Sequence, residues 1–385
     1  MSETNSKYNM NPAEWEFEFQ QRDMHPAVMT DLWLRATRDK LAEQFRLPVE
    51  NPDYLFTASY KGYIRSANKK DILNKLKIEI KNRDYLNYIL TRTMEVMAEF
   101  DAVMEQTVAI VNGKYAKEDL ATGWRNVEQA YLNTIPWYWI PWYLTEENLI
   151  SDRVKNGLEK YRSEIEKIID FNTALGILIF PTKDIIFQKE QEAFCDLVRI
   201  AVSSPSFKTD PGFRQRADIY LKEYAWMKTF FLLPVEPLSF DGLLARIDKV
   251  IGSNMLVEHD LQQKKKSEYA EVAKKLKKIF GSDTALMQAI ADAQELAWVL
   301  SASVENGVHA AAKLLPFNKI LAENLGVAYA DWIHLTSDEI VSILKGEATI
   351  SQIKIEQRKI GTAGLMQKGN IQWMWGDEAL VFSKY

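Results

Sequence analysis

Residues 137–144, with the sequence WYWIPWYL, constrain the fold more than any other stretch, because large rings and a helix-breaking proline stand together there. A proline removes a backbone donor and clashes with the preceding turn, so one long helix does not readily hold both Pro136 and Pro141. We therefore expect a helix that ends near Ile135, an aromatic corner, and a new helix capped by Thr145. The rings form either a ligand cage or, as we favour, the middle of a core.

The composition narrows the class of protein. The chain has 385 residues and a formal net charge of -5, whereas a nucleic-acid-binding protein usually carries a basic face. The lone cysteine, Cys195, excludes an intrachain disulfide and a Cys-based zinc cluster, so a reducing cytoplasm is expected. Residues 1–10 lack the apolar region of a signal peptide, and the most apolar runs, 174–180 and 230–235, are far shorter than the roughly 20 residues of a membrane helix. We expect a cytoplasmic protein that binds neither nucleic acid nor membrane.

The first third of the chain predicts short strands followed by long helices. Residues 15–19 alternate rings and acids as a half-buried strand does, and residues 54–65 are typical of a short strand or a hairpin. A helix is expected after Pro26. Residues 69–112 contain neither glycine nor proline and keep a helical spacing of apolar side chains, which predicts long packed helices with a break at residues 82–84.

The rest of the chain is expected to be helical up to a terminal hairpin. Helices are predicted over residues 117–135, 145–171, 183–202, 214–233 and 282–306, the last with a continuation to residue 325. Residues 371–382 predict a β-hairpin with a glycine-containing turn at Gly376.

A lysine-rich stretch at residues 264–278 raises the question of a nucleic-acid site. Tyr269, Val272, Leu276 and Ile279 step by three and four through the same segment. This spacing in an acidic chain favours the solvated face of an amphipathic helix.

These patterns predict a mainly α fold, an elongated multi-helix domain with minor β-strands at the N- and C-terminal ends. We divide it into three parts. Residues 1–67 form an N-terminal segment with short strands and one helix, residues 68–346 a helical domain, and residues 347–385 a linker and the C-terminal β-hairpin.

No complete catalytic constellation is visible. The chain contains no phosphate-binding glycine loop, no dinucleotide fingerprint, no His-Glu-x-x-His pair and no EF-hand loop. Glu305 and His309 share a helix face, but a polar pair is a better interpretation than a metal site. His25 is expected to cap or pack near a helix start. Cys195 is expected to be a small core residue rather than a nucleophile.

Aromatic residues in two parts of the sequence are the candidates for a substrate pocket. The candidates are Trp139 and Trp142 in the ring-rich stretch, and Tyr220, Tyr224 and Trp226 in a later helix. Arg214 precedes the later group and is a candidate anion contact. Rings at helical spacing are core residues more often than pocket walls, so both interpretations remain open.

Residues 334–346, with the sequence HLTSDEIVSILKG, are the most informative stretch for function. A Thr336/Glu339 capping box, an apolar stripe and Gly346 as terminator predict a helix. The stretch also resembles the Leu-Thr-x-x-Glu-Ile…Leu-x-Gly…Ile-x-x-Arg segment of phosphoenolpyruvate-utilising enzymes, such as phosphoenolpyruvate synthase and rifampicin phosphotransferase relatives. The later part of that segment is similar to residues 355–358, which end at Arg358.

The resemblance implies a helical region that lies between two other domains of such enzymes. There, an ATP-grasp domain phosphorylates a histidine on a swivelling domain, and that histidine carries the phosphoryl group. The nearest histidine here, His309 in residues 306–311, lacks the preceding Thr-Ser and lies in helical sequence, so no functional residue carries over. The resemblance implies no cofactor on this chain alone, with ATP and Mg belonging to separate ATP-grasp and phosphohistidine polypeptides.

Two further functions stay open. One is a helical small-molecule-binding or scaffold protein with an aromatic pocket and no catalysis. The other is a complete enzyme that uses His25 or His309. Our leading hypothesis is the one that the resemblance implies, a module of a phosphoenolpyruvate synthase-like phosphotransferase of the paired-acceptors type. This hypothesis also allows a small-molecule substrate.

Overall fold

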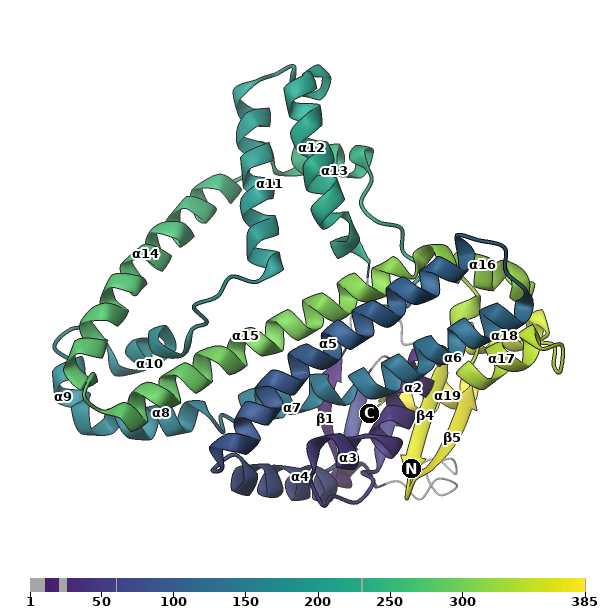
Figure 1. The fold of residues 1–385 in the computed structure, drawn as a ribbon, viewed down its shortest axis with the longest axis horizontal. Coiled ribbons are helices and arrows are strands. Elements are labelled where there is room, and N and C mark those ends of the chain that lie inside the picture. The colour runs from purple at the N-terminus through teal and green to yellow at the C-terminus, as the bar shows by residue number, and fades with distance from the viewer. Residues whose placement is uncertain (1–10, 21–25, 60, 230, 385) are drawn as a thin grey trace. The chain divides into compact units, whose positions relative to one another are not determined.

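The computed structural model describes residues 11–20, 26–59, 61–229 and 231–384. Their contacts divide the chain into two compact units. Unit 1 consists of Met1–Ile140, Phe231–Pro234 and Ala310–Tyr385, and unit 2 of Pro141–Phe230 and Val235–His309. The protein is mainly helical with one small antiparallel sheet, which confirms the predicted fold class (Figure 1).

The sheet of unit 1 joins segments from both ends of the chain. Its order is β1 (Trp15–Gln20), β3 (Lys61–Arg65), β2 (Tyr54–Phe56), β4 (Thr362–Gln367) and β5 (Asn370–Trp375). Every neighbouring pair is antiparallel, and β2 pairs with β4 so that Leu55 stands opposite Leu365. Purple and yellow strands therefore lie side by side in Figure 1.

Helices cover the sheet because its strands bury alternate side chains on opposite faces. Leu55 and Leu365 pack with Phe382, which follows α19 (Asp377–Leu380). On the other side α2 (Ala27–Asp39) approaches β4 so closely that a Cβ at Gly364 would lie 2.6 Å from Leu34 Cδ1. Glycine at this position thus permits the contact between helix and sheet.

The remaining helices of unit 1 lie in segments that were predicted to be helical, except α18 (Gln352–Ile360), which lies in the predicted linker. They are α3 (Leu41–Phe45), α4 (Ser66–Glu79), α5 (Arg83–Val111), α6 (Lys117–Thr134), α16 (Leu315–Leu325), α17 (Ser337–Leu344) and α18. Short 3-10 turns occur at η1 (Pro12–Glu14), η5 (Trp332–His334) and η6 (Val381–Lys384). The predicted break between α4 and α5 is confirmed, because the Asn82 side chain caps α5 by accepting the Asp84 N–H at 3.0 Å.

The ring-rich stretch is itself helical, so the predicted aromatic corner with a new helix at Thr145 is wrong. α7 (Pro136–Glu146) begins directly after α6 and contains Pro141. Pro136 occupies its first position, where a missing N–H costs nothing. Thr145 starts no helix, because its hydroxyl donates to the Pro141 carbonyl at 2.8 Å. Asn148, with φ of 55°, then turns the chain away from α7.

Unit 2 is built from helices, with α7 and α15 crossing its boundary with unit 1. Its elements are α8 (Ser151–Leu158), η2 (Glu159–Tyr161), α9 (Arg162–Ile165), α10 (Phe171–Ile179), α11 (Ile186–Ser203), η3 (Phe207–Thr209), α12 (Pro211–Tyr224), η4 (Ala225–Lys228), α13 (Phe240–Val250), α14 (Met255–Phe280) and α15 (Thr284–Lys313).

Two predicted helices of this region are interrupted. The helix expected over residues 145–171 is divided at η2 into α8 and α9. The helix expected over residues 214–233 ends with α12 and η4, because the next segment belongs to unit 1, where Phe231 takes a left-handed φ of 42° and Leu232 is fully buried.

The terminal hairpin lies earlier than predicted. β4 and β5 form it, with Lys368 and Gly369 both in the left-handed region at φ of 49° and 77°, as a tight two-residue turn requires. Residues expected as its second strand are helical instead. Gly376, with φ of 63°, ends β5 and its carbonyl accepts the Ala379 and Leu380 N–H groups.

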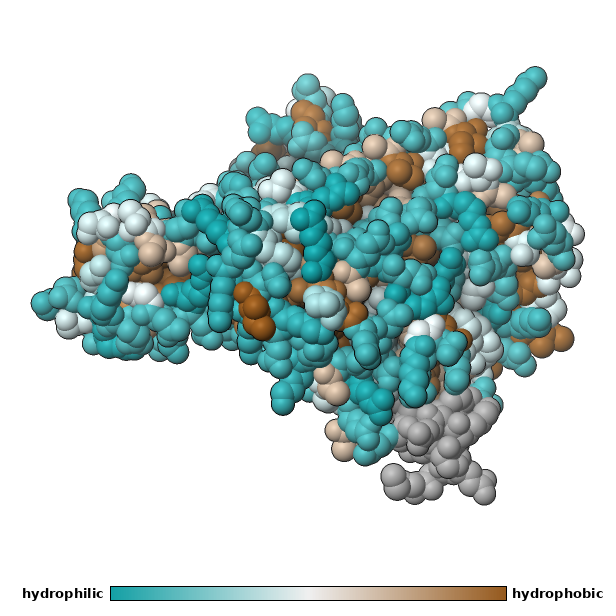
Figure 2. Space-filling view, turned by 60° about the horizontal axis from the view of Figure 1, so that its bottom comes forward, coloured by the Kyte–Doolittle hydropathy of each residue, from teal (hydrophilic) through white to brown (hydrophobic). Residues whose placement is uncertain are grey.

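The exposed face shown in Figure 2 is mostly hydrophilic, with hydrophobic residues in small separate patches. Among the described residues, no helix has the length and apolar character that crossing a bilayer requires.

Candidate functional site

The two candidates of the ring-rich stretch have different surroundings. Trp139, in unit 1, is 3% exposed. Its ring centroid lies 5.1 Å from that of Trp33 and 5.3 Å from that of Tyr54. Trp142, in unit 2, is half-buried and stacks on Tyr143 at 5.8 Å. Trp139 thus has the contacts of a core side chain.

The candidates Tyr220 and Tyr224 lie together in unit 2, with ring centroids 5.4 Å apart. The Tyr220 hydroxyl donates to the buried Glu190 carboxylate, and Arg246 Nη1 donates to the Tyr220 oxygen at 2.8 Å. Burial, followed by the bond to Glu190, raises the Tyr220 pKa above its ordinary value. The hydroxyl is therefore fixed as a hydrogen-bond donor inside this cluster.

Trp226 and Arg214 lie apart from that cluster's hydrogen bonds. The Trp226 ring contacts the His309 ring at 4.7 Å between centroids. Arg214 forms an exposed pair with Asp218 at 3.1 Å and stacks over Phe240. Whether any of these residues binds a ligand stays a prediction.

The other described residues that the sequence singled out lie within helices or interact with them. Both Glu305 carboxylate oxygens accept the first two N–H groups of α11, each at 2.8 Å, so Glu305 caps that helix. His309 lies within α15. Burial raises the pKa of the Cys195 thiol, which disfavours the nucleophilic thiolate. His25 is outside the described residues. Within those residues no cluster of His, Cys, Asp or Glu side chains could hold a metal ion.

The segment that carried the family resemblance is a junction in unit 1. We call Thr336, Ser337, Asp338 and Glu339, at the start of α17, the α17 hub. Thr336 and Glu339 form the predicted capping box. Glu339 also binds Arg358 of α18 through two bonds of 2.6 and 2.7 Å. The glutamate and the final arginine of the motif are thus joined by a bidentate ion pair.

Arg358 is held on three sides. Besides Glu339, it donates to the His334 backbone carbonyl at 2.8 Å and stacks over the Trp375 ring of β5 at 4.2 Å. Burial opposes ionisation of Glu339, but its bonds to Arg358 and Thr336 hold the Glu339 pKa below its ordinary value. The charged pair consequently fixes α17, α18 and β5 to one another.

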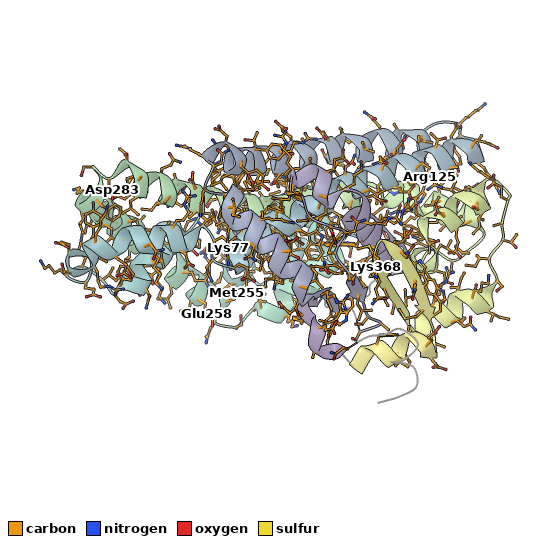
Figure 3. The ribbon with its side chains drawn as sticks, turned by 90° about the horizontal axis from the view of Figure 1, so that it is seen from below. Lys77, Arg125, Met255, Glu258, Asp283 and Lys368 are labelled. Carbon is orange, nitrogen blue, oxygen red and sulfur yellow. The ribbon has the colours of Figure 1, made fainter. Side chains whose placement is uncertain are left out.

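The other side of the α17 hub meets α2 and α6. The Ser337 N–H donates to Asp31 Oδ2 at 3.0 Å, and the Ser337 hydroxyl accepts the Trp124 indole N–H at 2.8 Å. Two arginines complete this cluster. Arg35 donates to Glu128, and Arg125, labelled in Figure 3, donates to Glu128 at 2.6 Å and to Asp338 at 3.0 Å.

Two buried groups near the hub have displaced pKa values. Burial raises the pKa of the Asp31 carboxyl to about 6, against the Ser337 N–H and Arg35, which lower it. Burial lowers the pKa of the His334 imidazole to about 4, and the His334 Nδ1 has no hydrogen-bond partner among the described atoms. Such displaced values mark places where proton uptake and structure are coupled.

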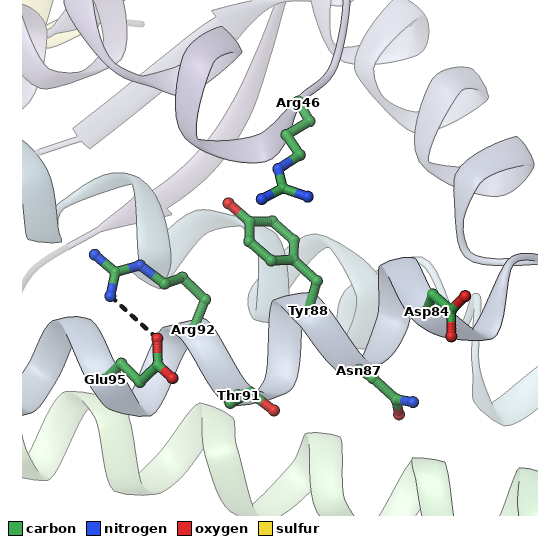
Figure 4. Close-up of a pocket in the computed structure, with 7 residues that line it drawn as sticks. All are labelled: Arg46, Asp84, Asn87, Tyr88, Thr91, Arg92 and Glu95. Atoms are coloured by element: carbon green, nitrogen blue, oxygen red, sulfur yellow. Dashed lines mark hydrogen bonds and ion pairs between the residues drawn. The ribbon is translucent and has the colours of Figure 1, made fainter.

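Unit 1 also carries a surface pocket of about 540 Å³ along α5 (Figure 4). The Arg46 guanidinium lies 3.9 Å above the Tyr88 ring, and the Tyr88 hydroxyl donates to the Gln44 carbonyl at 2.7 Å. Arg92 donates to Glu95 at 3.1 Å. Ligand pockets are mostly apolar with a few polar groups, whereas these walls are charged and already interact with one another.

The sequence singled out the motif but not its partners. Nothing local marks Asp31, Arg35 or Glu128 as members of a junction. Asp31 and Arg35 contact α17, and Glu128 binds Arg35, so these contacts join positions far apart in the chain. Helical spacing showed which faces were apolar, but not which helices would meet. Searches of protein-family models and of curated proteins find no match to this chain.

Proposed function

We propose that this chain is the helical module of a phosphoenolpyruvate synthase-like phosphotransferase, acting with separate ATP-grasp and phosphohistidine polypeptides in the cytoplasm. One observation carries the proposal. The residues that resemble the family segment, from Thr336 to Arg358, are joined as one physical unit by the capping box and the Glu339–Arg358 pair.

A role in positioning suits this chemistry. Phosphoryl transfer depends mainly on the alignment of the reacting groups and on charge stabilisation. A rigid helical frame therefore contributes to the rate without supplying the nucleophile. ATP and Mg would be held by the partner polypeptides, and the small-molecule substrate would bind where they meet the frame.

The experiment is an omission test with three purified proteins: the chain, an ATP-grasp polypeptide and a phosphohistidine polypeptide. The proposal predicts that neighbouring genes encode these two partners. We expect ATP consumption with a phosphoryl acceptor to require all three. A Glu339→Gln variant should lower turnover, and a Lys222→Glu variant, changed at an exposed site of α12, should not. Full turnover by the chain alone, or by the two partners without it, would refute the proposal.

A further inference from the structure

α14 is a long helix that unit 2 covers on one side only. Of its 26 residues, His259, Leu276 and Phe280 are buried. Val257 is 61% exposed and Leu261 53% exposed. Met255 and Glu258, labelled in Figure 3, stand in its first turn. The predicted apolar stripe is thus only partly used within this unit, and apolar side chains remain on the opposite side.

The charge of α14 is opposite to that of the chain. Seven lysines and four acidic residues give this helix a formal charge of +3 within a chain of -5, which leaves -8 on all the other residues. Lys264, Lys266 and Lys274 form ion pairs. Within the part of the chain that the structure describes, Lys265 and Lys275 form none. These two ammonium groups are available to carboxylates of another molecule.

Exposed apolar and basic groups share one side of the helix. At 3.6 residues per turn, Val257, Leu261 and Lys275 fall within a sector of about 40°, and Lys265 lies about 40° beyond Leu261. We call these four residues the outer face of α14. Glu268 also lies in this sector, and its carboxylate forms an ion pair with Lys264 at 4.0 Å. The outer face therefore offers an apolar strip beside positive charge.

We propose that the outer face of α14 binds an acidic protein surface, one that presents carboxylates around a narrow apolar strip. Complementary charge of this kind raises association rates and fixes orientation. A second copy joined through the same face would set lysine against lysine, which is repulsive. The face would bind such a surface whatever reaction the partner catalyses.

A lipid surface is a poorer fit. Helices that lie in a membrane interface have a wide, bulky apolar face opposite a charged one. Here the apolar strip consists of Val257 and Leu261, and Glu258 and Glu268 interrupt it or lie beside it. Acidic groups at that depth would be repelled by anionic headgroups.

The test uses the full chain and a fluorescein-labelled synthetic helix with leucines at i and i+4 flanked by glutamates. We expect binding by fluorescence anisotropy that weakens steeply between about 50 and about 300 mM salt, as screening requires. Lys265→Glu/Lys275→Glu should weaken binding about tenfold or more, and Leu261→Asn should also weaken it. The matched control Lys222→Glu/Lys249→Glu makes the same charge change on α12 and α13 and should leave binding unchanged.

Three outcomes would overturn the proposal. One is no binding of the acidic helix by the folded wild-type chain. Another is equal loss in both double variants, which would show a general charge effect. The third is co-sedimentation with vesicles containing phosphatidylserine but no binding to the acidic helix, which would assign the face to lipid. Circular dichroism of each variant establishes that it is folded.

Discussion

One charged pair of unit 1 and one of unit 2 differ in how far their side chains are exposed. In unit 1 the Arg358 side chain is 8% exposed and its partner Glu339 33% exposed. In unit 2 Arg199 is 40% exposed and its partner Asp260 66% exposed. Buried pairs fix a geometry because either partner alone is costly, whereas exposed pairs contribute little. The Glu339–Arg358 pair is therefore expected to fix the helices around it, and the Arg199–Asp260 pair to add little to stability.

The largest expected difference lies within one helix, α7, whose two tryptophans belong to different units. Trp139→Ala removes a ring packed on Trp33 and Tyr54 and should cost about 3–5 kcal/mol of unfolding free energy. Trp142→Ala removes a half-buried ring and should cost about 1–2 kcal/mol. Urea unfolding followed by circular dichroism measures both. A fully stable Trp139→Ala variant with altered ligand binding would restore the cage interpretation.

A second prediction concerns the pH dependence of unit 1. Because the Asp31 pKa is raised from 3.8 to about 6, its contribution to stability is complete below pH 3.8 and is lost as the pH rises through 6. Because the His334 pKa is lowered from 6.5 to about 4, its contribution is complete above pH 6.5 and is lost as the pH falls through 4. As the pH rises through this range, Asp31 therefore lowers the stability of the folded protein and His334 raises it.

Single variants separate these effects. Relative to wild type, the unfolding free energy of Asp31→Asn should rise by about 3 kcal/mol between pH 4 and pH 7, and that of His334→Phe should fall by about 3 kcal/mol. Urea unfolding at both pH values gives the two differences. If the unfolding free energies of wild type and both variants change by the same amount between the two pH values, neither group titrates in a buried site.

The Glu339–Arg358 pair should give the next largest effect. Glu339→Gln leaves Arg358 buried beside a neutral amide and should cost about 2 kcal/mol of unfolding free energy. Unfolding by urea at pH 7 is the measurement. A loss below about 0.5 kcal/mol is the size that an exposed pair gives. It would contradict the difference between this pair and the exposed pairs of unit 2.

The smallest effect is expected at Arg214 of unit 2. Its pair with Asp218 has both side chains more than half exposed, so Asp218→Asn should change the unfolding free energy by less than about 0.5 kcal/mol. The same urea titration applies. A cost equal to that of Glu339→Gln would contradict the difference between the units.

Local pattern allowed much of the helical framework to be predicted. The capping box at Thr336 and Glu339 appears in the structure as predicted, and so does the helix break at residues 82–84. Both features need only neighbouring residues. The second strand of the predicted terminal hairpin is wrong, because residues 377–384 are helical. The short apolar run at residues 379–382 does not distinguish a strand from a helix.

Contacts between distant segments could not be predicted in the same way. Leu55 faces Leu365 across the sheet, and Ser337 bonds to Asp31, although nothing near either residue indicates its partner. The division at residues 67 and 346 follows the chain order, whereas the observed units are defined by contacts. The same holds for the candidate site. The sequence shows the motif itself, but not the residues of other helices that contact it.

The most direct test of the account is where the phosphoryl label stays when the three proteins are mixed with ATP that is labelled at both its β and γ phosphoryl groups. The chain has four histidines, and a frame that only positions its partners should carry the label on none of them. We predict acid-labile label on the phosphohistidine polypeptide alone, with transfer onward to substrate only when this chain is present. Acid-labile label on this chain, lost in a His309→Ala variant, would contradict the account.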